Sequence, residues 1–206
     1  MMIKDLGGRI ASVWDGLRPI TREMLVVALK NGTPGSPNPK LPKFSYDAHA
    51  DWELSRLLSA LDEQSKSVEL RQDSVKLDEV RHLAETCARV LEAQSGSAEV
   101  FIQLAQRALR GHDYRKLDEL GDHLAHRYSV GEIAEVIRQT DSPQIRAIAY
   151  ETLAMLPVQS IAMLLDDSLY SDIAAAALEQ KAFEYESDEA RDVLDQFDAE
   201  NFTRSE

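Results

Sequence analysis

The sequence is poor in cysteine, aromatic residues and long apolar runs. Cys87 is the single cysteine, so no disulfide can form within the chain and a reducing compartment is expected. The apolar run MLVVAL at residues 24–29 is far too short to cross a membrane. The first residues are polar and of mixed charge, without the apolar segment of a signal peptide. These features predict a cytoplasmic protein without membrane contact.

Basic residues are scarce outside the N-terminal part of the chain. The net charge is −13, yet residues 1–43 hold seven Lys and Arg against three Asp and Glu. Residues 166–206 hold only three basic residues against thirteen acidic ones. An acidic surface repels phosphate backbones, so no direct binding of nucleic acid by the main body is expected. The acidity either suits a partner with a basic surface or serves solubility alone.

Residues 1–43 are predicted to form an N-terminal helical segment followed by a proline-rich linker or strap. Two short helices are expected within residues 3–31, divided at Pro19, with Thr21 capping the second. The four prolines of residues 31–43 exclude both a helix and a central strand there. The segment packs either on the remainder of the chain or on another molecule.

Residues 44–206 are predicted to form one α-helical repeat domain with an acidic C-terminal cap. Apolar residues recur at helical spacing over residues 47–63 and again over residues 75–93. Trp14 and Trp52 are expected to anchor their helices in the core. No segment alternates as a strand does, so an all-α protein is expected. The buried stripe predicted for the second of these helices consists of Val80, Leu83, Ala84, Cys87, Val90 and Leu91.

A repeat of 28 residues begins near residue 101. Small or apolar residues occupy the same places in three successive segments, 105–110, 133–138 and 161–166. A second set of segments shifts by the same amount, at 117–126, 145–154 and 173–182. A fixed period over three copies is typical of stacked helical hairpins. Each copy is expected to form a first helix of about ten residues, a turn and a second helix of about twelve residues.

The expected turns carry signals for helix starts. Ser129 and Glu132 have the spacing of a capping box, in which each residue satisfies a backbone donor of the other. Ser142 can cap the next helix, and Pro143 can occupy its first position. A partial and more polar fourth copy after Ser187 is expected to close the stack.

The segment DSPQIRAIAYETL, residues 141–153, resembles the second half of a HEAT repeat, in particular the short bacterial HEAT-like repeats. The matching residues are Asp141, Ile145, Arg146, Ala149 and Leu153. The resemblance extends over about residues 101–185, although Asp118 and Ala174 replace the arginine in the other copies. It implies a short α-solenoid that binds proteins, and it carries no catalytic residues. The alternative fold is an irregular helical bundle.

The stretch LDELGDHLAHRY, residues 117–128, places two carboxylates and two histidines at three- and four-residue spacings. On a helix they point away from the apolar stripe, either as a solvated face of paired side chains or as ligands of a surface metal ion. The solvated face is expected, without a cofactor, and a metal-dependent enzyme is the alternative. The four residues are Glu119, Asp122, His123 and His126.

The outward positions of the second helices become apolar along the array. A helix that is apolar on most sides is normally covered on two opposite faces, here either by the same chain or by a partner. We therefore expect a non-enzymatic adaptor, scaffold or regulatory subunit that binds another protein through an apolar groove with an acidic rim. A homo-oligomer is compatible with this pattern, and an acidic inhibitor that mimics nucleic acid is a further alternative. The predicted partner-binding residues are Ala147, Tyr150, Glu151, Ala154, Leu178 and Glu179.

Overall fold

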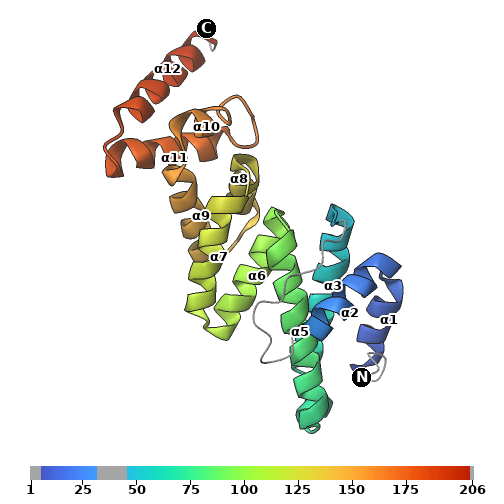
Figure 1. Cartoon of the computed structure of the whole chain (residues 1–206). Helices are drawn as coiled ribbons and strands as arrows, with labels where there is room; N and C mark the ends of the chain where they lie inside the picture. The colour runs from blue at the N-terminus through green and yellow to red at the C-terminus, as the bar shows by residue number, and fades with distance from the viewer. Residues whose placement is uncertain (1–5, 32–45, 205–206) are drawn as a thin grey trace. The chain divides into compact units, whose positions relative to one another are not determined.

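The computed structural model describes residues 6–31 and 46–204, and every regular element within these ranges is a helix (Figure 1). The expected all-α class is thus confirmed for this part of the chain. The chain divides into two compact units, residues 1–95 and 96–206. The boundary expected after residue 43, and the prolines of the expected linker, lie outside the described residues. None of the described helices is long and apolar enough to span a membrane.

The first unit is a small group of helices packed around α5. Helix α5 contacts α2, α3 and α4, while α3 also contacts α1 and α2. The predicted apolar stripe of α5 is buried along its whole length, which confirms it as the core face. Cys87 belongs to that stripe, and its thiol donates to the carbonyl of Leu54 at 3.3 Å. The helices are α1 (Gly8–Gly16), α2 (Pro19–Asn31), α3 (Ala48–Gln64), α4 (Val68–Arg71) and α5 (Ser74–Gln94).

The start of α2 differs from the expectation. Pro19 is the first residue of the helix, a position where its missing N–H leaves no hydrogen bond unmade. Thr21 therefore lies inside α2 and does not cap it, so that prediction was wrong. Its buried hydroxyl instead donates to the carboxylate of Glu53 on α3. The threonine thus joins two helices rather than starting one.

In the second unit, helices pack in pairs that follow the order of the chain. Helices α6, α8 and α10 are each packed against the helix that follows them. The first helices α6 and α8 also contact each other, as do the second helices α7, α9 and α11 in succession. The elements are α6 (Ala98–Gly111), α7 (Tyr114–Arg127), α8 (Val130–Gln139), α9 (Pro143–Met155), α10 (Val158–Ala162), α11 (Ser171–Glu184) and α12 (Asp188–Arg204).

The capping box predicted before α8 is only half formed. The Ser129 hydroxyl accepts a hydrogen bond from the N–H of Glu132 at 3.2 Å, as predicted. The Glu132 carboxylate, however, accepts from the N–H of Ala98 at 2.7 Å, in the first turn of α6. Ser97 is the N-cap residue of α6, but its side chain accepts no capping hydrogen bond. Glu132 therefore caps a neighbouring helix and ties α8 to α6.

Removing this bridging cap is expected to destabilise the second unit. Glu132→Ala leaves the N–H of Ala98 without its acceptor and is expected to cost about 1 kcal/mol, the usual cost of a lost N-cap. Urea denaturation followed by circular dichroism measures the change. Glu99→Ala removes a charge from the same first turn of α6 without touching this hydrogen bond. Equal losses for the two variants would show that charge, and not the cap, is responsible.

The start of α9 follows the prediction, whereas the third pair is shorter than predicted. Ser142 caps α9 by accepting from Ile145, and Pro143 is the first helical residue. Helix α10 has only five residues, although a first helix of about ten was expected from the repeat. Residues 163–170, which follow it, form turns.

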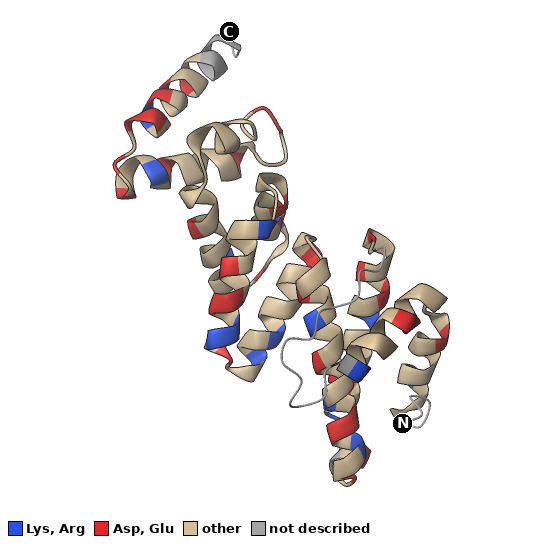
Figure 2. Ribbon diagram, viewed as in Figure 1, with Lys and Arg blue, Asp and Glu red and all other residues tan. Residues whose placement is uncertain are grey.

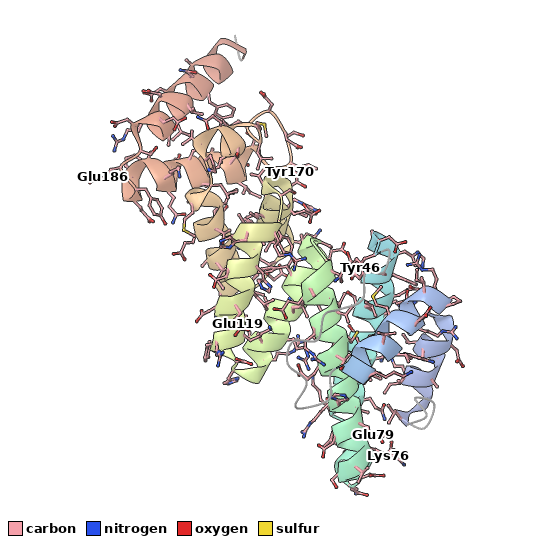
Figure 3. The ribbon with its side chains drawn as sticks, viewed as in Figure 1. Tyr46, Lys76, Glu79, Glu119, Tyr170 and Glu186 are labelled. Atoms are coloured by element: carbon pink, nitrogen blue, oxygen red, sulfur yellow. The ribbon has the colours of Figure 1, made fainter. Side chains whose placement is uncertain are left out.

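A polar contact holds the end of these turns. The hydroxyl of Tyr170, labelled in Figure 3, donates to the carboxylate of Glu135 on α8 at 2.9 Å. Arg138 also donates two hydrogen bonds to that carboxylate. These bonds, with Arg138 making the largest contribution, lower the pKa of Glu135 to about 2. The carboxylate therefore stays charged at neutral pH and fixes the turn that leads into α11.

Candidate functional site

The stretch at residues 117–128 occupies helix α7 as expected, with its leucines turned inward. Leu117, Leu120 and Leu124 are buried. A Cβ at Gly121 would lie 3.4 Å from Cγ2 of Ile148, so this glycine allows α9 to pack closely on α7. The leucines and the glycine thus specify how the helix packs.

The carboxylates and histidines of α7 do not converge on a common point. Glu119, labelled in Figure 3, forms ion pairs of 3.3 Å with Arg115 and Lys116. The Nδ1 atom of His126 lies 2.7 Å from the carbonyl oxygen of Asp122 on its own helix. In the part of the chain that the structure describes, no three His, Cys, Asp or Glu side chains are arranged to hold a metal ion. Glu119, Asp122 and His126 are exposed, as expected for a solvated face, whereas His123 is half-buried.

The six residues predicted to bind a partner divide into two groups. Ala147, Glu151 and Glu179 are exposed, and Tyr150 is half-buried. Ala154 and Leu178 are completely buried, so their prediction as surface contacts was wrong. The reason is tertiary packing, because α11 contacts α8, α9, α10 and α12 within the unit. The chain itself thus covers α11 on several sides.

Two cationic side chains also donate hydrogen bonds to the last turn of a neighbouring helix. The Lys181 ammonium on α11 donates to the carbonyl of Ala154 on α9 at 2.8 Å. The Arg191 guanidinium on α12 donates to the carbonyl of Ala182 on α11 at 2.9 Å. Carbonyls in the last turn of a helix lack helical partners and carry partial negative charge, so both contacts are favourable. They secure α11 on α9 and α12 on α11.

An open hollow remains between α9 and α11. Three of the predicted partner-binding residues line it, together with three residues that the sequence did not indicate. The Gln180 amide donates to the Glu184 carboxylate at 2.9 Å along the α11 side of the hollow. The lining residues are Ala147, Tyr150, Glu151, Gln180, Glu184 and Tyr185.

The hollow combines aromatic rings with carboxylates that are not neutralised. Among the described residues, neither Glu151 nor Glu184 has a cationic partner, whereas Glu119 and Glu135 are both paired with cations. Tyr185 is 47% exposed and presents its ring at the end of α11. The side chains are therefore equipped to contact a positively charged group.

The unit that contains the hollow is negatively charged, like the carboxylates of the hollow itself. The second unit holds ten Lys and Arg against twenty-two Asp and Glu, whereas the first holds thirteen against fourteen. Figure 2 shows red segments recurring along α12, with only isolated blue ones on α11 and α12. Almost all of the net negative charge of the protein therefore belongs to the unit that contains the hollow.

The sequence did not indicate Tyr185 as a site residue, because no glycine marks the end of α11. Glu186, labelled in Figure 3, adopts a left-handed φ of 53°, and the N–H of Ser187 donates to the carbonyl of Lys181. Glycine is the usual residue in such a turn, because other side chains rarely adopt this conformation. Glu186 gives no such signal in the sequence.

Comparisons with known proteins add no relative to these observations. No family model matches the chain, and no match is found among curated proteins or solved structures.

Proposed function

We propose that the protein is a protein-binding helical-repeat module, an adaptor, scaffold or regulatory subunit built as a short α-solenoid of the HEAT-like type. Its ligand is a basic segment of a partner protein, which binds in the hollow between α9 and α11. The observation that carries this proposal is the pair of tyrosines beside carboxylates without cationic partners, Glu151 and Glu184. Helices that pack pairwise in chain order fit a solenoid.

The hollow suits a lysine or arginine side chain. A guanidinium group stacks on an aromatic face and binds a carboxylate through two parallel hydrogen bonds. A single exposed ion pair contributes little, about 0–1 kcal/mol, so the binding relies on several groups acting together. The negative charge of the second unit also attracts a basic segment over a distance and raises the association rate.

The shape of the hollow favours a peptide over a small substrate. Sites for small molecules are enclosed, because they bury most of the surface of the ligand. This hollow is open to solvent and lies between two second helices. In HEAT-like proteins, which these repeats resemble, the second helices usually line the concave binding surface. An extended basic segment can therefore place one side chain in the hollow while its backbone remains outside.

Charge reversal in the hollow tests the proposal. The probe is a fluorescent peptide of alternating arginine and glycine, and fluorescence anisotropy measures its dissociation constant. Glu151→Lys combined with Glu184→Lys is expected to weaken binding by at least about tenfold, which corresponds to about 1.4 kcal/mol. A matched peptide with citrulline in place of arginine is expected to bind weakly to the unmodified protein, because citrulline is uncharged.

Glu179→Lys provides the matched control. Glu179 is exposed on α11 beside Gln180 but does not line the hollow, and its substitution makes the same change of charge. Each single variant, Glu151→Lys or Glu184→Lys, is expected to weaken binding more than Glu179→Lys does. Equal losses from all three would assign the binding to overall charge and reject the hollow as the site. Circular dichroism verifies that each variant retains its helices.

A further inference from the structure

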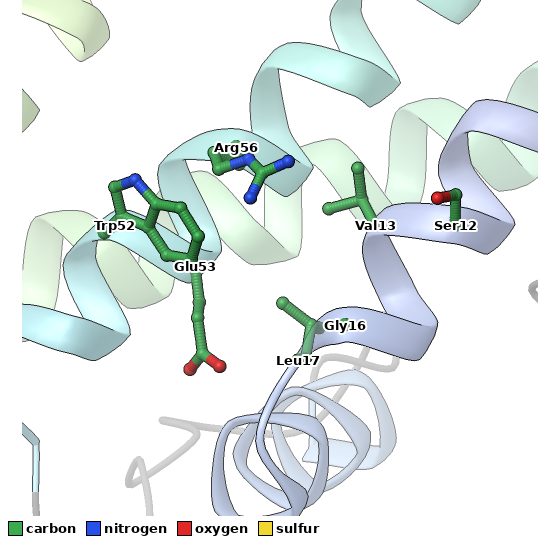
Figure 4. Close-up of a pocket in the computed structure, with 7 residues that line it drawn as sticks. All are labelled: Ser12, Val13, Gly16, Leu17, Trp52, Glu53 and Arg56. Carbon is green, nitrogen blue, oxygen red and sulfur yellow. The ribbon is translucent and has the colours of Figure 1, made fainter.

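A second and chemically different hollow lies in the first unit, where α1 packs against α3. Figure 4 shows Val13 and Leu17 of the α1 side facing Trp52 and Arg56 of α3 across it. Its volume is about 90 Å³. Pockets for drug-sized molecules are several times larger, whereas one aliphatic side chain is of this size. The lining residues are Ser12, Val13, Gly16, Leu17, Trp52, Glu53 and Arg56.

An exposed tryptophan, Trp52, lies at the mouth of this hollow, with the guanidinium of Arg56 against its ring. Trp52 is 54% exposed, so its predicted place in the core was wrong. The guanidinium carbon of Arg56 lies 4.5 Å from the centre of its ring, and the ring of His49 lies 5.6 Å away. Tryptophan and arginine are among the side chains enriched at the energetic centres of protein interfaces. Exposure of the pair therefore indicates an interaction surface.

The charge that this hollow offers to a ligand is positive. The Glu53 carboxylate also lines it, but its oxygens accept hydrogen bonds from Arg18 and Thr21, so it is already neutralised. Arg56 contacts the ring of Trp52 and has no carboxylate partner among the described side chains. Its guanidinium donors remain available to an anion. The hollow thus joins an apolar wall, formed by Val13 and Leu17, to one available cation.

We propose that this hollow is a second protein-docking site, which binds a partner segment that presents an aliphatic side chain next to a carboxylate. The aliphatic group enters between Val13, Leu17 and the ring of Trp52, and the carboxylate binds the guanidinium of Arg56. The bidentate fit between arginine and a carboxylate fixes the direction of the segment. Two docking sites of opposite charge preference would let the protein hold two different partners, as an adaptor does.

Gly16 offers a direct way to block the hollow. A Cβ at Gly16 or at Gly8 would meet no other atom within 4 Å, so both positions accept a side chain without a clash. Gly16 lines the hollow, whereas Gly8 begins the same helix and does not. Gly16→Leu is therefore expected to fill the site, and Gly8→Leu is the matched control. Arg56→Gln, at an exposed position, removes the cation without altering the core.

The test uses the full chain carrying Trp14→Phe, which leaves Trp52 as the only tryptophan. The probe is a short peptide with leucine next to aspartate, and matched peptides carry serine for leucine or asparagine for aspartate. The leucine–aspartate peptide is expected to change the fluorescence of Trp52 in a saturable manner. Gly16→Leu and Arg56→Gln are each expected to raise the dissociation constant by at least about tenfold, or about 1.4 kcal/mol. Gly8→Leu leaves it unchanged.

Three outcomes would overturn this proposal. The first is a Trp52 signal that does not respond to the peptide, and the second is equal binding by Gly8→Leu and Gly16→Leu. The third is self-association in sedimentation experiments that Arg56→Gln abolishes, which would assign the hollow to a second copy of the chain. The arginine peptide tests the hollow of the second unit, and the leucine–aspartate peptide tests the hollow of the first. Failure of one peptide to bind therefore rejects one proposal and leaves the other standing.

Discussion

Replacing Glu53 with alanine is expected to lower the free energy of unfolding of the first unit by about 3 kcal/mol, because buried partners lose their acceptor. The Glu53 side chain is only 2% exposed. Its carboxylate accepts from the backbone N–H of Arg18 at 2.6 Å and from the side chain of that arginine at 3.1 Å. It also accepts from the buried hydroxyl of Thr21. One carboxylate thus serves three donors between α1, α2 and α3.

Arg18 extends this network to the start of α3. Its guanidinium donates two further hydrogen bonds to Asp47, of 2.9 and 2.6 Å. Asp47 in turn caps α3 by accepting from the N–H of Ala50. The arginine between α1 and α2 is therefore held by both a cap and a buried carboxylate of α3. Loss of Glu53 removes the buried half of this arrangement.

Tryptophan fluorescence measures this effect selectively. Both tryptophans, Trp14 and Trp52, belong to the first unit, so urea denaturation followed by fluorescence reports on that unit. Glu63→Ala is the control, since Glu63 lies on the same helix in an exposed ion pair with Arg9. Its loss is expected to cost less than about 1 kcal/mol. Similar losses for Glu53→Ala and Glu63→Ala would contradict a special role for the buried carboxylate.

The same network makes the first unit sensitive to acid. Burial tends to raise the pKa of Glu53, but hydrogen bonds from Thr21 and Arg18 outweigh it, and the pKa lies below its usual value. Hydrogen bonds from Arg18 and from the backbone of Ala50 lower the pKa of Asp47 strongly. A lowered pKa stabilises the folded state above the unfolded value, about 4 for these groups, and this contribution is lost as pH falls through the folded pKa.

The denaturation midpoint of the unmodified protein is therefore expected to fall steeply below about pH 4. Glu53→Gln lacks one of the groups that must be protonated, so its midpoint is expected to be lower at neutral pH and to change less on acidification. Parallel curves for the two proteins would show that Glu53 does not contribute to the acid sensitivity.

Phe101→Ala is expected to lower the free energy of unfolding of the second unit by about 3–5 kcal/mol. Phe101 on α6 is 1% exposed, and its ring meets the edge of Tyr128 with centroids 5.8 Å apart. The substitution removes this contact and leaves a cavity that the surrounding helices fill only in part. Urea denaturation followed by circular dichroism at neutral pH measures the loss.

Phe183→Ala is the matched control for this core position. Phe183 lies on α11 in the same unit and is 77% exposed. Because alanine there removes little buried surface, the expected change is within about 0.5 kcal/mol. A loss comparable to that of Phe101→Ala would contradict the burial pattern and indicate that something covers Phe183 in solution.

The periodicity of the sequence predicted those elements that depend on one helix alone. The stripe through Val80 and Cys87 has helical spacing, and Ser142 followed by Pro143 is a local signal. The structure confirms both. A local signal suffices here because the hydrogen-bond partners lie within a few residues along the chain.

Features that depend on contacts distant in sequence were not predicted. Leu178 and Ala154 follow the outward face in a three-copy alignment, yet α11 is enclosed by four other helices and buries Leu178. Glu53 stands between Trp52 and Leu54 and looks like an ordinary solvated carboxylate. Only its distant partners explain why it is buried while its neighbour Trp52 is exposed.

The candidate site in the second unit was also predicted only in part from the sequence. Ala147, Tyr150 and Glu151 were predicted from the pattern of α9, and all three line the hollow. The alignment pairs Tyr150 with Leu178, whereas the structure places Gln180 and Glu184 in the hollow with it. A repeat period identifies equivalent residues in successive helices. It does not specify how far one helix is shifted along the next, and that shift decides which side chains share a hollow.

The contacts of Lys181 and Arg191 have a mechanical consequence. Each ties the last turn of one helix to a cation on a later helix, from α11 to α9 and from α12 to α11. A force applied at the C-terminal end therefore loads the Arg191 contact first and the Lys181 contact only after α12 has detached. The helices are expected to peel away singly, from the last toward the first, so the array extends under tension in ordered steps.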